Sequence, residues 1–283
     1  YNYTTRANET ISETGSFTTN INGAVILQNV FTNISYLIEA RRYGFPFNKT
    51  FIENLSAQGW NNLTIVAPTY TMFVNVLDTQ NAPAADLRLL AYDWNSSQTA
   101  QPGEYTDDNG NVTLSLTFGR YRLRLYKDTT FLNEVTVDLI KNQPLVVNCD
   151  VYNVNLNVRV VDYFGQPIPN VLVVFQRRIN SNYQTTETQT TGADGIAYFD
   201  DIIGGDSRVY VSVEGRPSET QYLYLVGPSR DVVFKMDGYV AFVGYALETT
   251  QFLTIILLLI LFVAFIIVSN YKRLLRLFQK REK

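Results

Sequence analysis

The chain has 283 residues, of which 46% are hydrophobic and 17% charged, and it carries a net charge of −3 with no histidine and one cysteine. The lack of histidine excludes Ser-His-Asp and Cys-His catalytic arrangements and removes the commonest metal ligand. One cysteine excludes a disulfide within the chain. The 19 tyrosines and 17 phenylalanines supply bulk for folded cores and, with abundant Asn and Thr, favour strands over helices.

The first repeat, residues 1–70, is predicted to be an incomplete β-sandwich. It opens with "YNYTT", without an initiator Met or a signal-peptide pattern, so we expect either a removed signal sequence or a longer protein. Residues 15–28, "GSFTTNINGAVILQ", indicate a strand, an Asn-Gly turn and a returning strand. The fourteen residues before them contain no apolar strand. The repeat therefore lacks an opening strand pair.

A sandwich without its opening pair would expose apolar side chains and unpaired backbone. The side chains expected to be exposed are Val25, Leu27, Ile38 and Ala40. Two sources of the missing strands are open: residues upstream of Tyr1, which we favour, or a strand lent by a neighbouring subunit.

Residues 71–152 and 153–239 are predicted to be two further β-sandwich repeats. Their turn phrases, "GEYTDDNGNVTLSL" (103–116) and "TTGADGIAYFDDI" (190–202), match that of the first repeat. Landmark residues also align, as Asp78 with Asp162, Pro83 with Pro167, Leu87 with Val171, and Leu89 with Val173. A unit of about 80–90 residues is too long for a solenoid repeat, so each copy is expected to be a whole domain.

Within a repeat the hydrophobic period is two. The segment "YRLRLY" places Tyr121, Leu123 and Leu125 on one face and Arg122 and Arg124 on the other. Such alternation is typical of half-buried antiparallel strands. About seven strands in fewer than 90 residues predict an all-β fold of tandem immunoglobulin-like, or prealbumin-like, β-sandwiches, followed by a single transmembrane α-helix.

The third repeat resembles the carboxypeptidase-regulatory-like, or prealbumin-like, sandwich family. The family pattern D-x-x-G-x-P, followed by T-x-x-x-G, is matched at Asp162, Gly165, Pro167 and Gly195. The second repeat departs from it, with Asn81 where the first glycine stands. The resemblance implies the fold, and it implies a spacer, adhesive or accessory role rather than a specific chemistry.

Two acidic turns are the strongest candidates for chemistry. They comprise Asp107, Asp108 and Asn109, and Asp200, Asp201 and Asp206 around Gly204–Gly205. Calcium uses such oxygens, but no run has full calcium-loop spacing and turn chemistry already accounts for these residue types. We therefore predict no catalytic residue, no metal site and no cofactor. Cys149 shares an alternating apolar face and is expected to be a buried core thiol.

Tyrosines stand at polar-face positions of several expected strands, as at Tyr126, Tyr210 and Tyr224. Two interpretations are open for them. One is ordinary cross-strand pairing. The other is a contact surface for another surface protein.

Eight N-x-[ST] sequons are present, all in the first 113 residues, and they predict an outward-facing, glycosylated surface. The acceptors are Asn2, Asn8, Asn33, Asn48, Asn54, Asn62, Asn95 and Asn111.

Residues 240–271 are predicted to be a juxtamembrane segment and a transmembrane helix. Thr249–Tyr271 contains no charge and spans about 34 Å as a helix, enough to cross a ~30 Å hydrocarbon layer. The tail, 272–283, is basic, through Lys272, Arg273, Arg276, Lys280, Arg281 and Lys283. With Glu282 it carries +5, which leaves −8 on residues 1–271. A cationic flank on one side predicts a cytoplasmic tail and an extracellular N-terminal part.

The combined pattern resembles archaeal envelope proteins of the surface-layer type. We predict a non-catalytic, single-pass cell-surface glycoprotein that acts as a stalk or anchor for a surface-layer or adhesive assembly. Its partners would be the lipid bilayer, N-linked glycans and other surface or membrane proteins, and the acidic ectodomain argues against nucleic acid. Two alternatives are the anchor region of a surface enzyme such as a protease, and an accessory subunit of a larger membrane complex.

Overall fold

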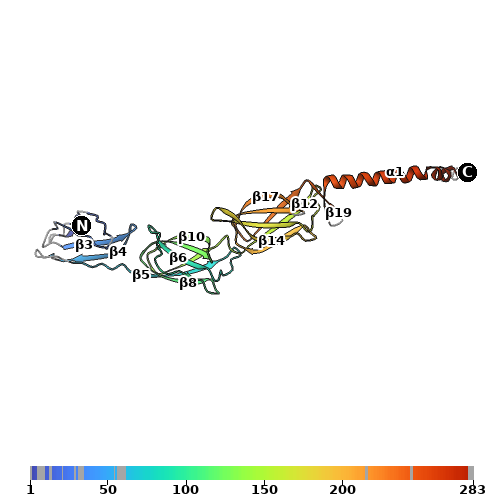
Figure 1. Ribbon diagram of the computed structural model, residues 1–283. Helices are drawn as coiled ribbons and strands as arrows, with labels where there is room; N and C mark the ends of the chain where they lie inside the picture. Colours follow the sequence, from blue (N-terminus) through green and yellow to red (C-terminus); the bar gives the residue numbers. More distant parts are fainter. Residues whose placement is uncertain are drawn as a thin grey trace. The chain divides into compact units, whose positions relative to one another are not determined.

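The computed structural model describes residues 2–4, 10–12, 15–20, 22–28, 30, 35–53, 55, 62–213, 216–242 and 245–279. This part of the chain consists of short strands followed by one long helix, α1 (Thr249–Gln279) (Figure 1). Two compact units are present: the first contains residues 1–77 and 83–148, and the second contains residues 78–82 and 149–283. The predicted class, all-β sandwiches followed by one apolar helix, is confirmed.

The first unit begins with an antiparallel sheet in the order β2-β1-β3-β4. Its strands are β1 (Asn2–Thr4), β2 (Thr10–Ser12), β3 (Ser35–Arg42) and β4 (Phe45–Ile52). Two three-residue strands, β1 (NYT) and β2 (TIS), lie in the first fourteen residues, where no apolar strand was predicted. Residues 15–20 and 22–28 form the expected turn but no strands, so the hairpin predicted there was wrong.

The same unit contains a seven-stranded β-sandwich, built from the sheets β11-β5-β8 and β10-β9-β6-β7. Its strands are β5 (Thr69–Leu77), β6 (Arg88–Asp93), β7 (Glu104–Tyr105), β8 (Asn111–Thr117), β9 (Gly119–Lys127), β10 (Thr130–Leu139) and β11 (Gln143–Asn148). Met72, Leu89, Leu123 and Leu125 fill its core with at most 1% exposure. Each such side chain contributes about 1.5–3 kcal/mol by burial.

The second unit contains another seven-stranded sandwich, with the sheets β15-β12-β18 and β14-β13-β16-β17. Its strands are β12 (Val154–Asp162), β13 (Leu172–Ile179), β14 (Asn182–Thr190), β15 (Ile196–Ile202), β16 (Gly205–Val213), β17 (Arg216–Leu225) and β18 (Ser229–Met236). Phe175, Phe199 and Phe234 lie fully buried in its core. When the strands of each sandwich are counted in chain order, the two sandwiches have the same strand order in both sheets. The internal sequence repeat is therefore a repeat of topology.

One pairing in each sandwich was not predicted. The last strand runs parallel to the first, with Leu145 opposite Val74 in one sandwich and Val232 opposite Val158 in the other. In the N-terminal sheet the described residues have no counterpart of β5 or β12. Residues 62–68, which align with β11 and β18, accordingly have no regular structure.

The thrice-repeated phrase is one local turn. In it, the N–H of the first residue donates to the carbonyl of the residue four positions later, and the glycine N–H donates to the carbonyl of the first residue. The first and last residues of the three turns are Asn20 and Ala24, Asp107 and Asn111, and Gly192 and Ile196. The glycine φ is +72° at Gly23, +72° at Gly110 and +73° at Gly195. This is a type I turn with a left-handed glycine bulge, and it forms wherever the phrase occurs because its hydrogen bonds are local.

A buried threonine before this turn anchors each sandwich. Thr191 Oγ1 accepts a bond from Val171 N (2.9 Å) and donates to Ile168 O (2.8 Å). Thr106 makes the same pair of bonds with Leu87 N and Ala84 O. The threonine of the T-x-x-x-G pattern therefore satisfies two buried backbone groups that would otherwise be unpaired.

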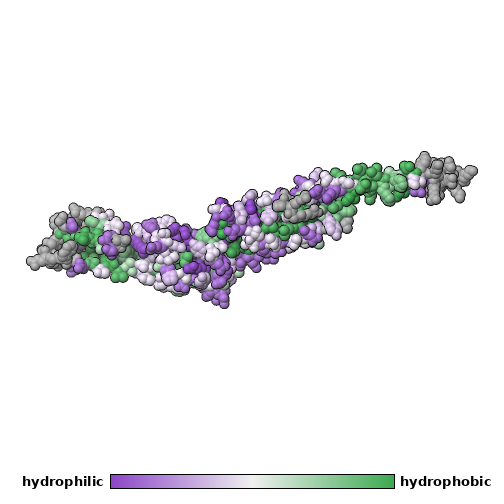
Figure 2. All heavy atoms as spheres, in the orientation of Figure 1, coloured by the Kyte–Doolittle hydropathy of each residue, from purple (hydrophilic) through white to green (hydrophobic). Residues whose placement is uncertain are grey.

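A short hairpin, β19 (Tyr239–Phe242) and β20 (Tyr245–Glu248), follows the second sandwich and leads into α1. The Glu248 N–H donates to Gln251 Oε1 (3.3 Å), a capping interaction at the start of the helix. Thr249–Asn270 is long and apolar enough to cross a membrane, and its most apolar 18 residues have a mean hydropathy of 3.3. Figure 2 shows the hydrophobic surface of this segment, which is exposed along its length.

Candidate functional site

No catalytic constellation was predicted, so the candidate site is the set of polar contacts that hold the ends of the sandwiches. Asp162 is fully buried, and its Oδ1 accepts bonds from Phe164 N (2.9 Å) and Gln166 N (2.8 Å). Asp78 Oδ1 caps its own turn in the same way, through Gln80 N and Ala82 N. The predicted alignment of the two aspartates therefore holds at the level of individual atoms.

The turns also explain why the second repeat departs from the family pattern. Gly165 and Asn81 occupy the same position and have φ values of +81° and +61°. Asparagine is among the few residues other than glycine that enter the left-handed region readily. Asn81 therefore adopts the left-handed conformation that glycine supplies in the D-x-x-G-x-P pattern.

The second carboxylate oxygen of each aspartate accepts a hydrogen bond from a residue distant in sequence within the same unit. Asp162 Oδ2 accepts a 2.9 Å bond from Ala241 N in β19, and Tyr163 N donates to Tyr239 O. Asp78 Oδ2 accepts a 2.9 Å bond from Asn153 Nδ2. The aspartate thus fixes its own turn with one oxygen and the distant residue with the other.

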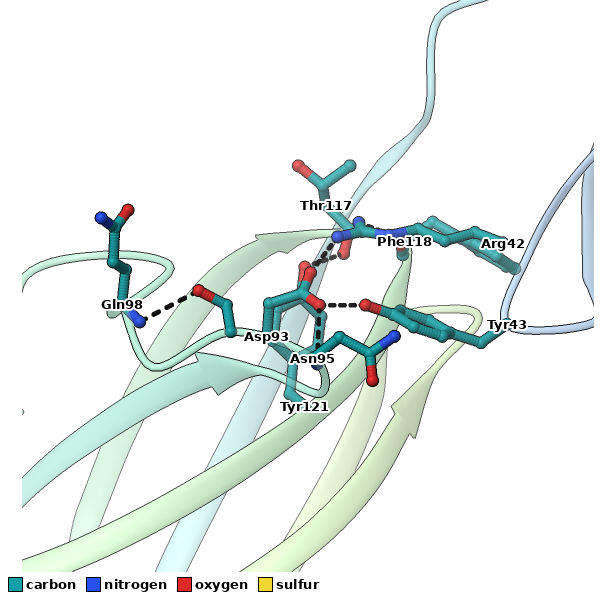
Figure 3. Close-up of polar contacts among 9 residues, drawn as sticks. Arg42, Tyr43, Asp93, Asn95, Gln98, Thr117, Phe118 and Tyr121 are labelled. Atoms are coloured by element: carbon teal, nitrogen blue, oxygen red, sulfur yellow. Dashed lines mark hydrogen bonds and ion pairs between the residues drawn. The ribbon is translucent and has the colours of Figure 1, made fainter. Parts of the chain in front are cut away.

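A third polar contact lies inside the first unit (Figure 3). Arg42, the last residue of β3, and Tyr43, in the turn that follows, both reach Asp93. The guanidinium pairs with Oδ2, and the phenol donates to Oδ1. Arg42 Nη1 also donates to Phe118 O (2.7 Å). A Cβ at Gly119 would lie 3.0 Å from Arg42 Nη1, so a side chain there would press on the guanidinium.

Burial and the neighbouring Asp93 carboxylate raise the pKa of Tyr43. Burial likewise raises the pKa of Tyr121, whose phenol donates to Thr117 O. Both hydroxyls therefore stay protonated donors at neutral pH. The cluster joins the β3–β4 hairpin to the sandwich, and the Phe47 ring packs at a tilt against Phe118, with 5.4 Å between ring centroids.

Alternating arginines on β9 extend this contact, and sequence analysis did not predict their partners. Arg120 pairs with Asp138 (2.6 Å) and lies over the rings of Trp94 and Phe45. Arg124 pairs with Glu134 and lies 5.0 Å from the ring of Tyr92. The hydrogen bond from Arg120 lowers the pKa of Asp138. Both arginines on the outward face of β9 are therefore held by an ion pair and by contacts with aromatic rings.

The two acidic turns do not come together as a cation site. Asp107 Oδ1 accepts bonds from Asn109 N and Asn111 N, as turn chemistry requires. Asp206 bonds Arg178 and Tyr183, which lower its pKa. Within the described ranges no three acidic, histidine or cysteine side chains lie close enough to share a metal ion. The expected burial of Cys149 is confirmed, and burial raises the pKa of its thiol to about 11.

Four of the eight predicted glycan acceptors have described side chains. Asn62, Asn95 and Asn111 are exposed, and Asn48 is half-buried with its Oδ1 bonded by the Thr50 hydroxyl. Asn2 lies in β1, and the remaining acceptors, Asn8, Asn33 and Asn54, lie outside the described residues. The use of these sites stays a prediction.

The predicted basic flank lies on and beyond the end of α1. The helix continues past Asn270 to Gln279 and includes Lys272, Arg273 and Arg276. Lys280, Arg281 and Lys283 lie outside the described residues. The orientation deduced from these cations stays a prediction.

The tyrosines divide between the two interpretations. Tyr126 is half-buried and pairs edge-on with Phe131 across the strands, at 5.7 Å. Tyr210 is half-buried beside Val174. Tyr224, by contrast, is 70% exposed. Cross-strand pairing therefore accounts for Tyr126, whereas Tyr224 presents its ring to solvent.

Comparison with known proteins finds likeness of structure but not of sequence. No protein family and no curated protein matches the sequence. The structure is similar to the minor pilin GBS52 of Streptococcus agalactiae (14% identity, 59% of this chain, 94% of that chain, TM-score 0.38). It is also similar to a putative adhesin of Bacteroides ovatus (11%, 64%, 95%, TM-score 0.36) and to the shaft pilin SpaA of Lactobacillus rhamnosus GG (10%, 62%, 100%, TM-score 0.28).

Proposed function

We propose that this chain is a non-catalytic, membrane-anchored cell-surface glycoprotein that serves as a stalk or anchor for a surface-layer or adhesive assembly. The observation that carries the proposal is the short connection between a rigid sandwich and an exposed apolar helix. β18 ends at Met236 and α1 begins at Thr249, with only the hairpin β19–β20 between them. The bonds Asp162–Ala241 and Thr249–Gly238 hold that connection at both of its ends. A stalk needs such a connection to keep its assembly at a fixed position on the membrane.

The charge distribution supports an orientation with the sandwiches outside. Six cations in residues 272–283 favour the cytoplasmic side, and all eight sequons precede the helix in the sequence. In this arrangement the partners are the bilayer, N-linked glycans at the exposed acceptors, and other surface proteins. The assembly has a surface-layer or adhesive character, and the chain carries out no reaction and binds no nucleic acid.

Cysteine labelling of intact cells tests the topology. Tyr224→Cys places a thiol on the exposed face of β17, and Lys272→Cys places one just beyond the span. The native Cys149 is buried with its pKa raised to about 11, so it stays unlabelled in the folded protein. A membrane-impermeant maleimide should label Tyr224→Cys on intact cells and Lys272→Cys only after permeabilisation. The reverse pattern would overturn the orientation.

A helix exchange separates a stalk from an accessory subunit. Residues 249–270 are replaced by an unrelated apolar helix of equal length, with the hairpin and the basic tail retained. A stalk needs only an anchor, so the surface assembly should stay attached to the cell. Loss of the assembly with a correctly inserted chimera would show that the helix recognises another membrane protein, and the stalk proposal would fail.

A further inference from the structure

The hairpin β19–β20 has two faces with different surroundings. Its register pairs Val240 with Leu247, and Ala241 with Ala246. Because side chains alternate along a strand, Tyr239, Ala241 and Ala246 share one face. All three pack against the core of the second sandwich. The sandwich-facing side is therefore already occupied by protein.

The opposite face, which we call the outer face, is made of Val240, Phe242, Tyr245 and Leu247. Val240 is buried, whereas Phe242 is 47% and Tyr245 73% exposed. No charged residue occurs between Tyr239 and Leu247. A soluble surface hairpin would place polar side chains here, so the composition of this face calls for an apolar neighbour.

The first turn of helix α1 contacts this face. The Phe242 ring lies 5.9 Å from that of Phe252, in the first turn of the helix, and Thr249 N donates to Gly238 O at the base of the hairpin. The outer face is therefore continuous with the apolar surface of α1 at the point where the helix leaves the sandwich. Whatever surrounds the first turns of α1 also meets Phe242 and Tyr245.

We propose that the outer face of β19–β20 is seated in the extracellular interface of the lipid bilayer. This inference rests on the proposed function, in which α1 spans the membrane. Aromatic rings with an apolar body suit the head-group level, and Tyr245 adds a hydroxyl that stays hydrated there. The depth is limited, because a two-stranded hairpin leaves backbone groups unpaired at its edges and these cannot enter hydrocarbon.

Seating both the hairpin and the helix fixes the second sandwich to the membrane at two places. Asp162 links the hairpin to the sandwich through Ala241, and the backbone links it to α1. A helix alone would allow the sandwich to pivot about residue 249. With the hairpin in the interface, pivoting would pull Phe242 and Tyr245 out of the lipid, at a cost in buried apolar area.

Tryptophan quenching by brominated lipids tests the seating. In the full chain, Trp60 and Trp94 are changed to Phe, and single reporters are introduced as Phe242→Trp or Tyr245→Trp. The protein is reconstituted in phosphatidylcholine vesicles with bromines either near the head groups or near the acyl-chain ends. We expect both reporters to be quenched, at least twofold more by the shallow bromines than by the deep ones.

Two control reporters separate this inference from the proposed function. Phe262→Trp, in the middle of the helix, should be quenched most by the deep bromines, and Tyr222→Trp, 66% exposed on β17, should not be quenched. An unquenched helix reporter would overturn the membrane anchor itself. A quenched helix reporter with unquenched reporters at 242 and 245 would overturn only the seating, and would indicate that protein or water covers the hairpin.

Discussion

Asp162 Oδ2 lies 2.9 Å from the backbone nitrogen of Ala241 and accepts its hydrogen bond, so one buried carboxylate joins the second sandwich to the hairpin that precedes the membrane helix. The other oxygen of Asp162 is used by its own turn. Both carboxylate oxygens therefore accept hydrogen bonds, and no other side chain of similar shape offers two acceptors. Asparagine would present a donor where an acceptor is needed, and alanine would provide no acceptor.

Asp162→Ala should loosen the hairpin. Three partly buried backbone N–H groups lose a charged acceptor, and a hydrogen bond to a charged group contributes about 1.5–3 kcal/mol. Hydrogen exchange of the full chain in lipid nanodiscs should therefore be at least tenfold faster in residues 239–248. Asp194→Ala is the control, because Asp194 caps an exposed turn of the same sandwich through Ile196 N. Unchanged exchange in the hairpin of the Asp162 variant would contradict the linking role.

Thr191→Val should destabilise the second sandwich by about 1–3 kcal/mol, because it keeps the shape and removes the hydroxyl that bonds Val171 N and Ile168 O. Hydrogen exchange of peptides from β13 and β15 measures this loss. Thr188→Val on β14 is the matched control, since Thr188 is exposed and near-neutral substitution is expected at the surface. Equal effects of the two changes would show that the buried threonine does not anchor the turn.

Gly195→Ala should cost more than Gly165→Ala, although both glycines have positive φ. The left-handed conformation costs alanine about 1–2 kcal/mol at either position. At Gly195 a Cβ would also lie 2.7 Å from Pro167 Cβ and 2.8 Å from Val160 O, whereas nothing lies within 4 Å at Gly165. The difference between the two variants in hydrogen exchange of β12 isolates the close contact. Equal losses of protection in the two variants would show that the backbone around Pro167 shifts enough to accommodate the methyl group.

The repeats could be predicted from the sequence because their landmarks are local. Aspartate, proline and glycine at fixed spacings set turns whose hydrogen bonds span four residues, and the alternation on β9 and β16 follows from the pleat. The parallel pairing of β11 with β5 could not be predicted, because it joins segments about 70 residues apart. β14, "NYQTTETQT", shows no apolar alternation and is a strand because it pairs with β13.

The candidate site was harder to predict than the fold. Asp78 and Asp162 were noticed as landmarks, but their second oxygens bond residues 75 and 79 positions away. The hairpin β19–β20 was missed because residues 240–248 carry a single charge and lie directly before the apolar helix, so they were assigned to its juxtamembrane segment. Arg42 and Asp93 are 51 positions apart, and no spacing rule connects them. The available signal was a pair of opposite charges at two strand ends.

The link between Tyr43 and Asp93 predicts a response to alkaline pH. Burial and the adjacent carboxylate raise the pKa of Tyr43 above its usual value near 10, because ionisation would place a second anion beside Asp93. The folded state therefore holds this proton more tightly than the unfolded state. The stabilisation is fully present below the unfolded pKa and is lost as the pH rises through the raised folded pKa.

A difference titration measures this pKa directly. The ultraviolet absorbance of tyrosinate is recorded against pH for the native chain and for Tyr43→Phe, and the difference reports Tyr43 alone. We expect a midpoint above pH 10, and a lower midpoint in an Asp93→Asn background, where the neighbouring charge is gone but burial remains. At neutral pH, Tyr43→Phe should also weaken the attachment of the β3–β4 hairpin by about 0.5–1.5 kcal/mol through the lost hydrogen bond. A midpoint at or below 10 in the native chain would mean that Tyr43 is not held against Asp93 in solution.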